Sequence, residues 1–162
     1  MKKKSLLLVS MLLILSLSLI ACGQADEADA ENPMQYVSIE DLKEDVEAGS
    51  DEYVILDVRK VEDYDSSHIR GSYAADVDAA NKGGDDDTGI ANLKAGLKEA
   101  TGSETGNDGE KYALVCYSGK SYAEKATELM VGMGISEDQI YTVEGGITAW
   151  EEAGDEYTEL LD

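Results

Sequence analysis

The 162-residue sequence is poor in several residue types, and each shortage narrows what the protein can do. It has two cysteines, one histidine, and 13 lysines and arginines against 35 aspartates and glutamates, giving a formal net charge of −22. Such an acidic surface argues against binding to nucleic acid and against electrostatic docking on anionic lipid. The single histidine, His68, has no base or cluster of metal-ligating residues beside it in the sequence. We therefore expect His68 to order a turn by hydrogen bonding, and we expect no metal site.

The long apolar run of residues 6–21 follows three lysines at the N-terminus. It is shorter than the roughly 20 residues that a helix needs to cross a bilayer, and it fits a secretory signal. The run ends in residues 19–22 (LIAC), which resemble the lipobox of bacterial lipoproteins. This resemblance implies a cleaved signal peptide at 1–21, lipidation of Cys22, and anchoring at the extracytoplasmic face of the cell membrane. An ordinary secretory signal needs no cysteine there, and an uncleaved anchor is usually longer.

The rest of the chain has room for one domain. Residues 22–34 are acidic, rich in alanine and without apolar periodicity, which predicts a flexible tether. Residues 35–156 are long enough for one hydrophobic core and short for two domains. We expect an insertion at about 77–109 and an acidic tail at 157–162.

Strand and helix patterns alternate along this domain. Short apolar runs predict strands at 35–37, 53–56, 72–75, 111–115 and 139–143. Helical spacing predicts helices at 39–48, 61–64, 90–100, 122–133 and 146–153. This alternation predicts an α/β fold with a central parallel sheet of about five strands and helices on both faces.

The segment 76–109 interrupts the alternation and is rich in Gly, Asp and Asn. Three successive aspartates, residues 85–87, raise the question of a calcium site. Their spacing does not match the EF-hand loop, in which ligands occupy alternate positions. We therefore expect a solvated acidic loop, followed by one helix at 90–100.

Cys116 is the candidate nucleophile. Once Cys22 is lipidated, Cys116 is the remaining thiol, and it directly follows a predicted buried strand. Ligands of open α/β sheets bind at the carboxyl ends of strands, and a tight loop that enters a helix directs its amides to one point. This setting favours the thiolate over the thiol, so Cys116 needs no general base to act as a nucleophile. Gly119 allows the positive φ that such a loop tends to need. The alternative is a buried, inert cysteine.

Three motifs in the expected order resemble those of rhodanese-like domains. They are residues 56–59 (LDVR) with 68–71 (HIRG), residues 116–121 (CYSGKS), and residues 144–150 (EGGITAW). The resemblance extends over about residues 35–154 and implies a rhodanese-like fold and sulfurtransferase activity. Cys116 would take sulfane sulfur as a covalent persulfide, with no other cofactor. The backbone amides of the loop after Cys116 would hold the persulfide. This loop consists of Tyr117, Ser118, Gly119, Lys120 and Ser121.

The resemblance also implies the partners of the reaction. The donor would be thiosulfate, a persulfide or a polysulfide, and the acceptor would be a thiol, cyanide or a protein. We expect three residues to support the site. Asp57 would tie the strand-end loops through backbone N–H groups, Arg59 would either neutralise Asp57 or face the site, and His68 would order its turn. Tyr117 either shapes the mouth of the site or is an exposed aromatic residue.

The loop departs from the family pattern in one respect. The family often has arginine at the fifth position after the cysteine, where this chain has Ser121, so Lys120 is the only positive charge in the loop. Lysine lacks the fork that binds an oxyanion in two places, which weakens the case for thiosulfate. It also weighs against phosphatase chemistry, whose longer loop ends in arginine. Arsenate reduction is also disfavoured, because no second cysteine is available to resolve an intermediate. A non-catalytic binding or sulfide-sensing role is the alternative to an enzyme.

Overall fold

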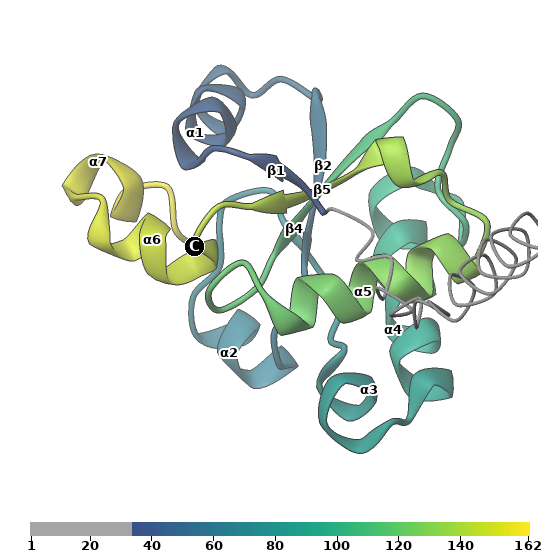
Figure 1. Cartoon of the computed structure of the whole chain (residues 1–162). Coiled ribbons are helices and arrows are strands. Elements are labelled where there is room, and N and C mark those ends of the chain that lie inside the picture. The colour runs from purple at the N-terminus through teal and green to yellow at the C-terminus, as the bar shows by residue number, and fades with distance from the viewer. Residues whose placement is uncertain (1–33) are drawn as a thin grey trace, which may run out of the picture. The chain divides into compact units, whose positions relative to one another are not determined.

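The computed structural model describes residues 34–162, in which strands and helices alternate around one sheet (Figure 1). The predicted signal peptide, the lipidation site Cys22 and all of the predicted tether except Met34 lie outside the described residues. Within the described part, no helix is both long enough and apolar enough to cross a membrane.

The sheet has five parallel strands in the order β1-β5-β4-β2-β3. They are β1 (Gln35–Val37), β2 (Tyr53–Asp57), β3 (Tyr73–Ala74), β4 (Lys111–Val115) and β5 (Ile140–Val143). The predicted α/β class and the parallel central sheet of five strands are confirmed. β4 occupies the middle, and its sequence is an apolar run because both of its faces are covered.

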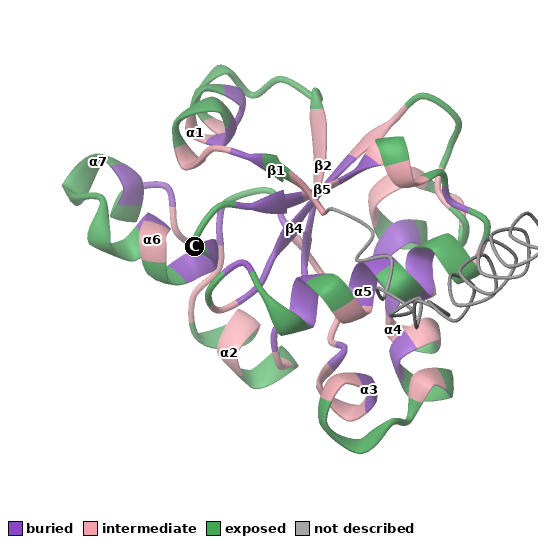
Figure 2. Ribbon diagram, in the orientation of Figure 1, coloured by how far each residue is buried: buried purple, intermediate pink, exposed green. Residues whose placement is uncertain are grey.

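Helices cover both faces of the sheet (Figures 1 and 2). One layer contains α1 (Ile39–Ala48), α6 (Gly146–Glu152) and α7 (Asp155–Thr158). The other contains α3 (Asp78–Gly83), α4 (Asp86–Thr101) and α5 (Ser121–Gly132). Two short helices complete the fold, α2 (Val61–Ser66) and the 3-10 helix η1 (Glu137–Gln139).

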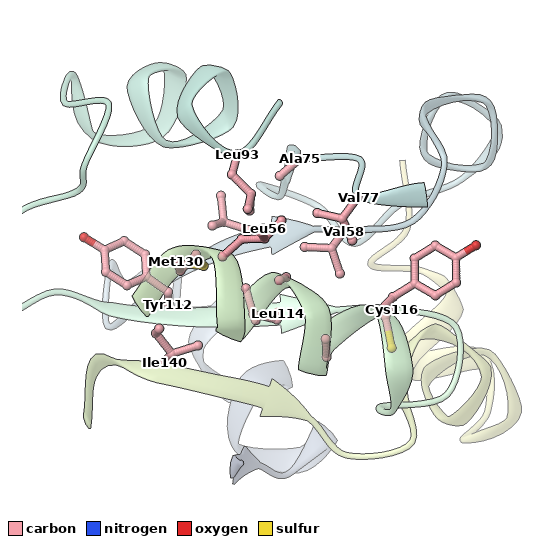
Figure 3. Close-up of a cluster of buried hydrophobic side chains, with 14 of the residues drawn as sticks. Leu56, Val58, Ala75, Val77, Leu93, Tyr112, Leu114, Cys116, Met130 and Ile140 are labelled. Atoms are coloured by element: carbon pink, nitrogen blue, oxygen red, sulfur yellow. The ribbon is translucent and has the colours of Figure 1, made fainter. Parts of the chain in front are cut away.

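Side chains of β4 alternate between the two cores, as successive residues of a strand do. Tyr112, Leu114 and Cys116 pack on the side of α3, α4 and α5 (Figure 3). Ala113 and Val115 pack on the side of α1, α6 and α7. Cys116 therefore places a free thiol in the apolar core on this side of the sheet.

The expected ends of the first helix are present. Ser38 caps α1 by accepting a hydrogen bond from the Asp41 amide at 3.0 Å, which satisfies one of the free amides of the first turn. Gly49 ends the helix in the left-handed region, with φ of 58°. The helix after Cys116 begins at Ser121, as its pattern predicted within one residue.

The prediction of an acidic loop at residues 85–87 is wrong. Asp85 caps α4 by accepting the Thr88 amide at 3.2 Å, and the next two aspartates lie in the first turn, where the helix dipole favours negative charge. The helix is thus longer than the predicted 90–100, and α3 precedes it. Leu93 and Leu97 of α4 are fully buried against the sheet, so much of the predicted insertion is part of the core.

Residues 157–162, predicted as an acidic tail, contribute apolar side chains to the domain. Tyr157 and Leu160 are buried in the core on the side of α1 and α6, and Leu161 pairs with Ile69 in an isolated antiparallel bridge. The Arg70 amide donates to the Leu160 carbonyl at 2.8 Å. The apolar residues of this segment pack while its acidic side chains stay exposed, which a charge-based prediction overlooks.

Candidate functional site

Cys116 lies at the carboxyl end of β4, where the central strand turns into the loop before α5. It is 2% exposed, and its Sγ accepts a hydrogen bond from the Gly119 amide at 3.1 Å. Gly119 has φ of 67°, so the loop folds back toward the sulfur in a conformation that favours glycine. The sulfur thus sits inside its own loop, at the amino-terminal side of a 12-residue helix.

The loop residues differ in exposure. Ser118, Lys120 and Ser121 are exposed, Tyr117 is half-buried, and Gly119 is buried. The α5 helix that follows adds positive potential from its amino-terminal amides. A buried sulfur with an amide donor beside a helix N-terminus is an arrangement that stabilises a thiolate or another anionic sulfur.

A second loop supports the first. The Cys116 carbonyl accepts the Ile147 amide at 2.8 Å, and the Tyr117 carbonyl accepts the Thr148 amide at 3.2 Å. A Cβ atom on Gly146 would lie 2.3 Å from the Cys116 carbonyl oxygen, and one on Gly119 would lie 2.8 Å from the Val143 carbonyl oxygen. The two loops therefore touch backbone to backbone.

The sequence predicted that Gly145 and Gly146 open the last helix and belong to a family motif, but it did not predict their contact with the cysteine loop. The signal that could have revealed it is topological. Two glycines follow β5 after one residue, Glu144, and β5 neighbours β4 in the sheet, so the two strand-end loops lie side by side.

Asp57 and Arg59 form a buried ion pair at the end of β2. The Arg59 Nη2 atom lies 2.7 Å from Asp57 Oδ2, and these side chains are 5% and 0% exposed. The Arg59 amide donates to Asp57 Oδ1 at 3.0 Å, a contact within the same strand-end loop. Burial lowers the pKa of Arg59, but the hydrogen bonds and charge of Asp57 outweigh it, so the pKa lies above its ordinary value.

The Arg59 side chain also makes contacts beyond Asp57. Besides neutralising Asp57, its guanidinium donates to the Ser67 carbonyl at 2.7 Å and lies 5.9 Å from the centre of the Tyr117 ring. Arg59 therefore joins the first motif to the cysteine loop, so both of the alternatives considered for it hold in part.

His68 orders its turn, as expected. Its Nδ1 lies 2.9 Å from the Tyr64 carbonyl oxygen, and its ring stacks on the Tyr64 ring at 3.9 Å. Its backbone pairs with Asp162. These contacts account for the histidine structurally. Among residues 34–162, no group of three or more His, Cys, Asp or Glu side chains is placed to hold a metal ion.

Two tyrosines at the loop donate hydrogen bonds to distant carboxylates. The hydroxyl of Tyr117 donates to Asp63, and that of Tyr122 donates to Asp78. The two rings meet edge to face with centres 5.1 Å apart. Burial, followed by the hydrogen bond to Asp63, raises the pKa of Tyr117 to about 12. Sequence reasoning missed both carboxylates, since no local pattern links residues 54 and 44 positions apart.

Comparison with known proteins agrees with this description. A family model described as rhodanese-like domain matches residues 38–153. A search of curated proteins finds no match. Similar solved structures include the rhodanese-like domain of an Anabaena protein, 18% identical with a TM-score of 0.55, covering 78% of this chain and 77% of that one.

The names of two other similar structures refer to an activity. The human single-domain sulfurtransferase is 18% identical with a TM-score of 0.52, covering 74% of this chain and 97% of that one. A Rhodopseudomonas palustris protein of unknown function, described as a possible tyrosine phosphatase, is 18% identical with a TM-score of 0.51, covering 75% and 82%. At these identities the likeness establishes the fold alone. Because the family model matches most of its length, the chain belongs to the rhodanese-like domain family.

Proposed function

We propose that this protein is a sulfurtransferase that carries sulfane sulfur as a persulfide on Cys116. The observation that carries the proposal is the setting of Sγ, which accepts the Gly119 amide at 3.1 Å within a loop that enters α5. That setting stabilises a thiolate for attack and an anionic persulfide afterwards. The shared fold with a human single-domain sulfurtransferase supports the same chemistry.

The reaction has two displacements. The Cys116 thiolate attacks the outer sulfur of the donor, an S–S bond forms at Sγ, and the donor's S–S bond breaks with its electron pair on the leaving sulfite or thiolate. The acceptor, which is a thiol, cyanide or a protein thiol, then attacks the outer sulfur of the persulfide. The Cys116 thiolate leaves, so no external oxidant or reductant is needed.

Donor choice follows from the loop and the surface. Ser121 stands where the family often has arginine, so the loop lacks the fork that grips a tetrahedral oxyanion. The net charge of −22 repels a dianion at long range. A persulfide or polysulfide donor therefore fits at least as well as thiosulfate.

The reaction takes place at the outer face of the cell membrane in this proposal, with the domain held by lipid on Cys22. The basis is the LIAC motif after a short apolar run. Growth of an expressing bacterium with a labelled fatty acid should label the protein, and Cys22→Ala should abolish the label. Equal labelling of both proteins would disprove the anchor.

The decisive test of the chemistry uses the full chain in detergent with Cys22→Ser, which leaves Cys116 as its one thiol. Incubation with polysulfide or thiosulfate should add one sulfur atom, detected by intact mass, and cyanide should remove it as thiocyanate. Cys116→Ser in the same background should gain nothing. If no sulfane donor modifies Cys116, the proposal fails, and phosphatase activity would be sought with an aryl phosphate.

A sulfide-sensing or binding role is the second candidate, favoured by the 2% exposure of Cys116. A sensor would take up sulfur but release it too slowly for turnover. Single-turnover loading followed by steady-state transfer to a thiol separates the two roles. A pure scaffold would bind its partner unchanged after Cys116→Ser.

A further inference from the structure

Tyr117, the residue after the nucleophile, is held at both of its ends. Its carbonyl accepts the Thr148 amide at 3.2 Å, and its hydroxyl donates to the Asp63 carboxylate. The same oxygen lies 3.4 Å from the Lys60 amide nitrogen. The Arg59 guanidinium lies against the ring. This side chain therefore has little freedom, and neither does the peptide group that joins it to Cys116.

We propose that Asp63, outside the loop and all three sequence motifs, is a positioning residue that fixes the sulfur-holding loop through the Tyr117 hydroxyl. The inference rests on the proposed sulfurtransferase function. A carboxylate is an acceptor with no competing donor, and a hydrogen bond to a charged acceptor is shorter and stronger than one to a neutral group. The Tyr117 hydroxyl keeps its proton at neutral pH, since its pKa is about 12.

Asp63 can hold the loop because its own helix is held by other contacts. No residue of α2 is buried, so polar groups attach this helix to the domain. The Val61 amide donates to Asp76 at 3.1 Å, and the Tyr64 hydroxyl donates to the Ser72 carbonyl at 2.8 Å. These contacts place Asp63 independently of Tyr117, so loss of the Tyr117 hydroxyl should release the loop rather than unfold α2.

Release of the loop has a chemical consequence. The Gly119 amide reaches Sγ only while the loop keeps its curvature between Cys116 and α5. A looser loop lengthens that hydrogen bond on average and withdraws stabilisation from the thiolate. The midpoint for reaction of Cys116 should then move to higher pH, and sulfur loading should slow.

The test compares Tyr117→Phe, Asp63→Ala and Asp63→Asn in the full chain with Cys22→Ser. We expect the first two to slow sulfur loading about tenfold, within the range that small misplacements of reacting groups cause. They should also raise the pH midpoint of Cys116 alkylation by iodoacetamide. Asp63→Asn should restore most of the rate, since its amide oxygen still accepts the phenol proton while the charge is gone.

Tyr112→Phe is the matched control. Tyr112 lies on β4, the strand that leads into Cys116, and it is buried. Its hydroxyl donates to Glu110 at 2.9 Å, so it is also a tyrosine paired with a carboxylate. Its loss should lower the melting temperature and leave alkylation and loading unchanged. Wild-type loading by Tyr117→Phe, or equal slowing by Tyr112→Phe, would overturn the inference. If even the parent protein takes up no sulfur, the proposed function fails, while the alkylation midpoint still tests Asp63.

Discussion

The two ends of the central strand β4 are built from similar parts and do different work. Each end has a tyrosine paired with a carboxylate, an ion pair and a glycine with positive φ nearby. The amino end also borders a cavity of about 560 Å³, lined in part by Asp45, Arg70 and Lys111. The candidate nucleophile nevertheless lies at the carboxyl end, in a tight loop with little open space around its sulfur.

The candidate nucleophile thus lies where a backbone amide points at its sulfur, and not where the larger cavity is. At the carboxyl end, β4 leads directly into a loop and the helix α5, and the Gly119 amide donates to Cys116 Sγ. At the amino end, β4 is preceded by a turn, where Lys111 donates to the Glu52 carboxylate and the Gln139 side chain donates to the Glu110 carbonyl. Substitutions of matched residues at the two ends of β4 test whether the two ends differ in sulfur uptake and in stability.

The largest effect should come from Cys116 itself. Cys116→Ser should abolish sulfur uptake, because a hydroxyl is neither ionised nor nucleophilic enough under the same conditions. Lys111→Gln, at the other end of the strand beside the cavity, should leave uptake unchanged. Intact mass after incubation with polysulfide measures both. Loss of uptake in Lys111→Gln would show that the amino end takes part in the chemistry.

The ion pairs should rank next. Arg59→Ala removes one partner of a buried pair and leaves Asp57 charged and 0% exposed, which should cost about 3–5 kcal/mol of unfolding free energy. Lys111→Ala breaks a solvent-exposed pair with Glu52, which water and salt screen, so its loss should have a much smaller effect on stability. Denaturant unfolding measures both. Similar losses at the two ends would mean that burial does not distinguish these pairs.

Sequence reasoning reached the parallel sheet and the cysteine loop because both follow from local patterns. Apolar runs marked β2 and β4, and the position of Cys116 followed from strand, loop and helix in succession. It failed at residues 85–87, where acidic residues form a helix start rather than a loop. At 157–162 the acidic residues are evident from the sequence, whereas the burial of Tyr157 and Leu160 among them was not predicted.

The support around Cys116 could not be predicted in the same way. Asp63 and Asp78 reach the loop because α2 and α3 follow the ends of β2 and β3. In the sheet, β2 lies beside β4, and β3 lies beside β2. The contact of Gly146 with the Cys116 carbonyl likewise depends on the placement of β5 beside β4. Such contacts are set by topology, and a single sequence carries no local signal for them.

Alanine substitutions of a glycine at each end separate the cost of backbone strain from the cost of a steric clash. Gly146→Ala would place a Cβ 2.3 Å from the Cys116 carbonyl oxygen at φ of 61°, whereas Gly109→Ala, at φ of 84°, meets nothing within 4 Å. Gly109→Ala should cost about 1–2 kcal/mol, and Gly146→Ala should cost about 1–3 kcal/mol more from overpacking. Gly146→Ala should also slow sulfur loading. Equal unfolding free energies would mean that the two loops yield without cost.

The smallest effect should appear in alkali, at the two tyrosines. The pKa of Tyr117 and that of Tyr112 are each raised from 10.0 to about 12, with burial as the first cause at both ends. The folded state then keeps phenol protons that the unfolded state loses, so the stabilisation is complete below about pH 10 and is lost as pH rises through about 12.

Tyr117→Phe and Tyr112→Phe should each remove one high-pH step from the phenolate absorbance titration and flatten the alkaline decline in stability by similar amounts. Equal electrostatic effects with unequal effects on sulfur loading would show that the two phenols differ only in what they hold in place. If the step that Tyr117→Phe removes lies near pH 10 instead of near 12, the Tyr117 hydroxyl is not tied to Asp63 in solution, and the asymmetry between the two ends of β4 must come from the loop backbone alone.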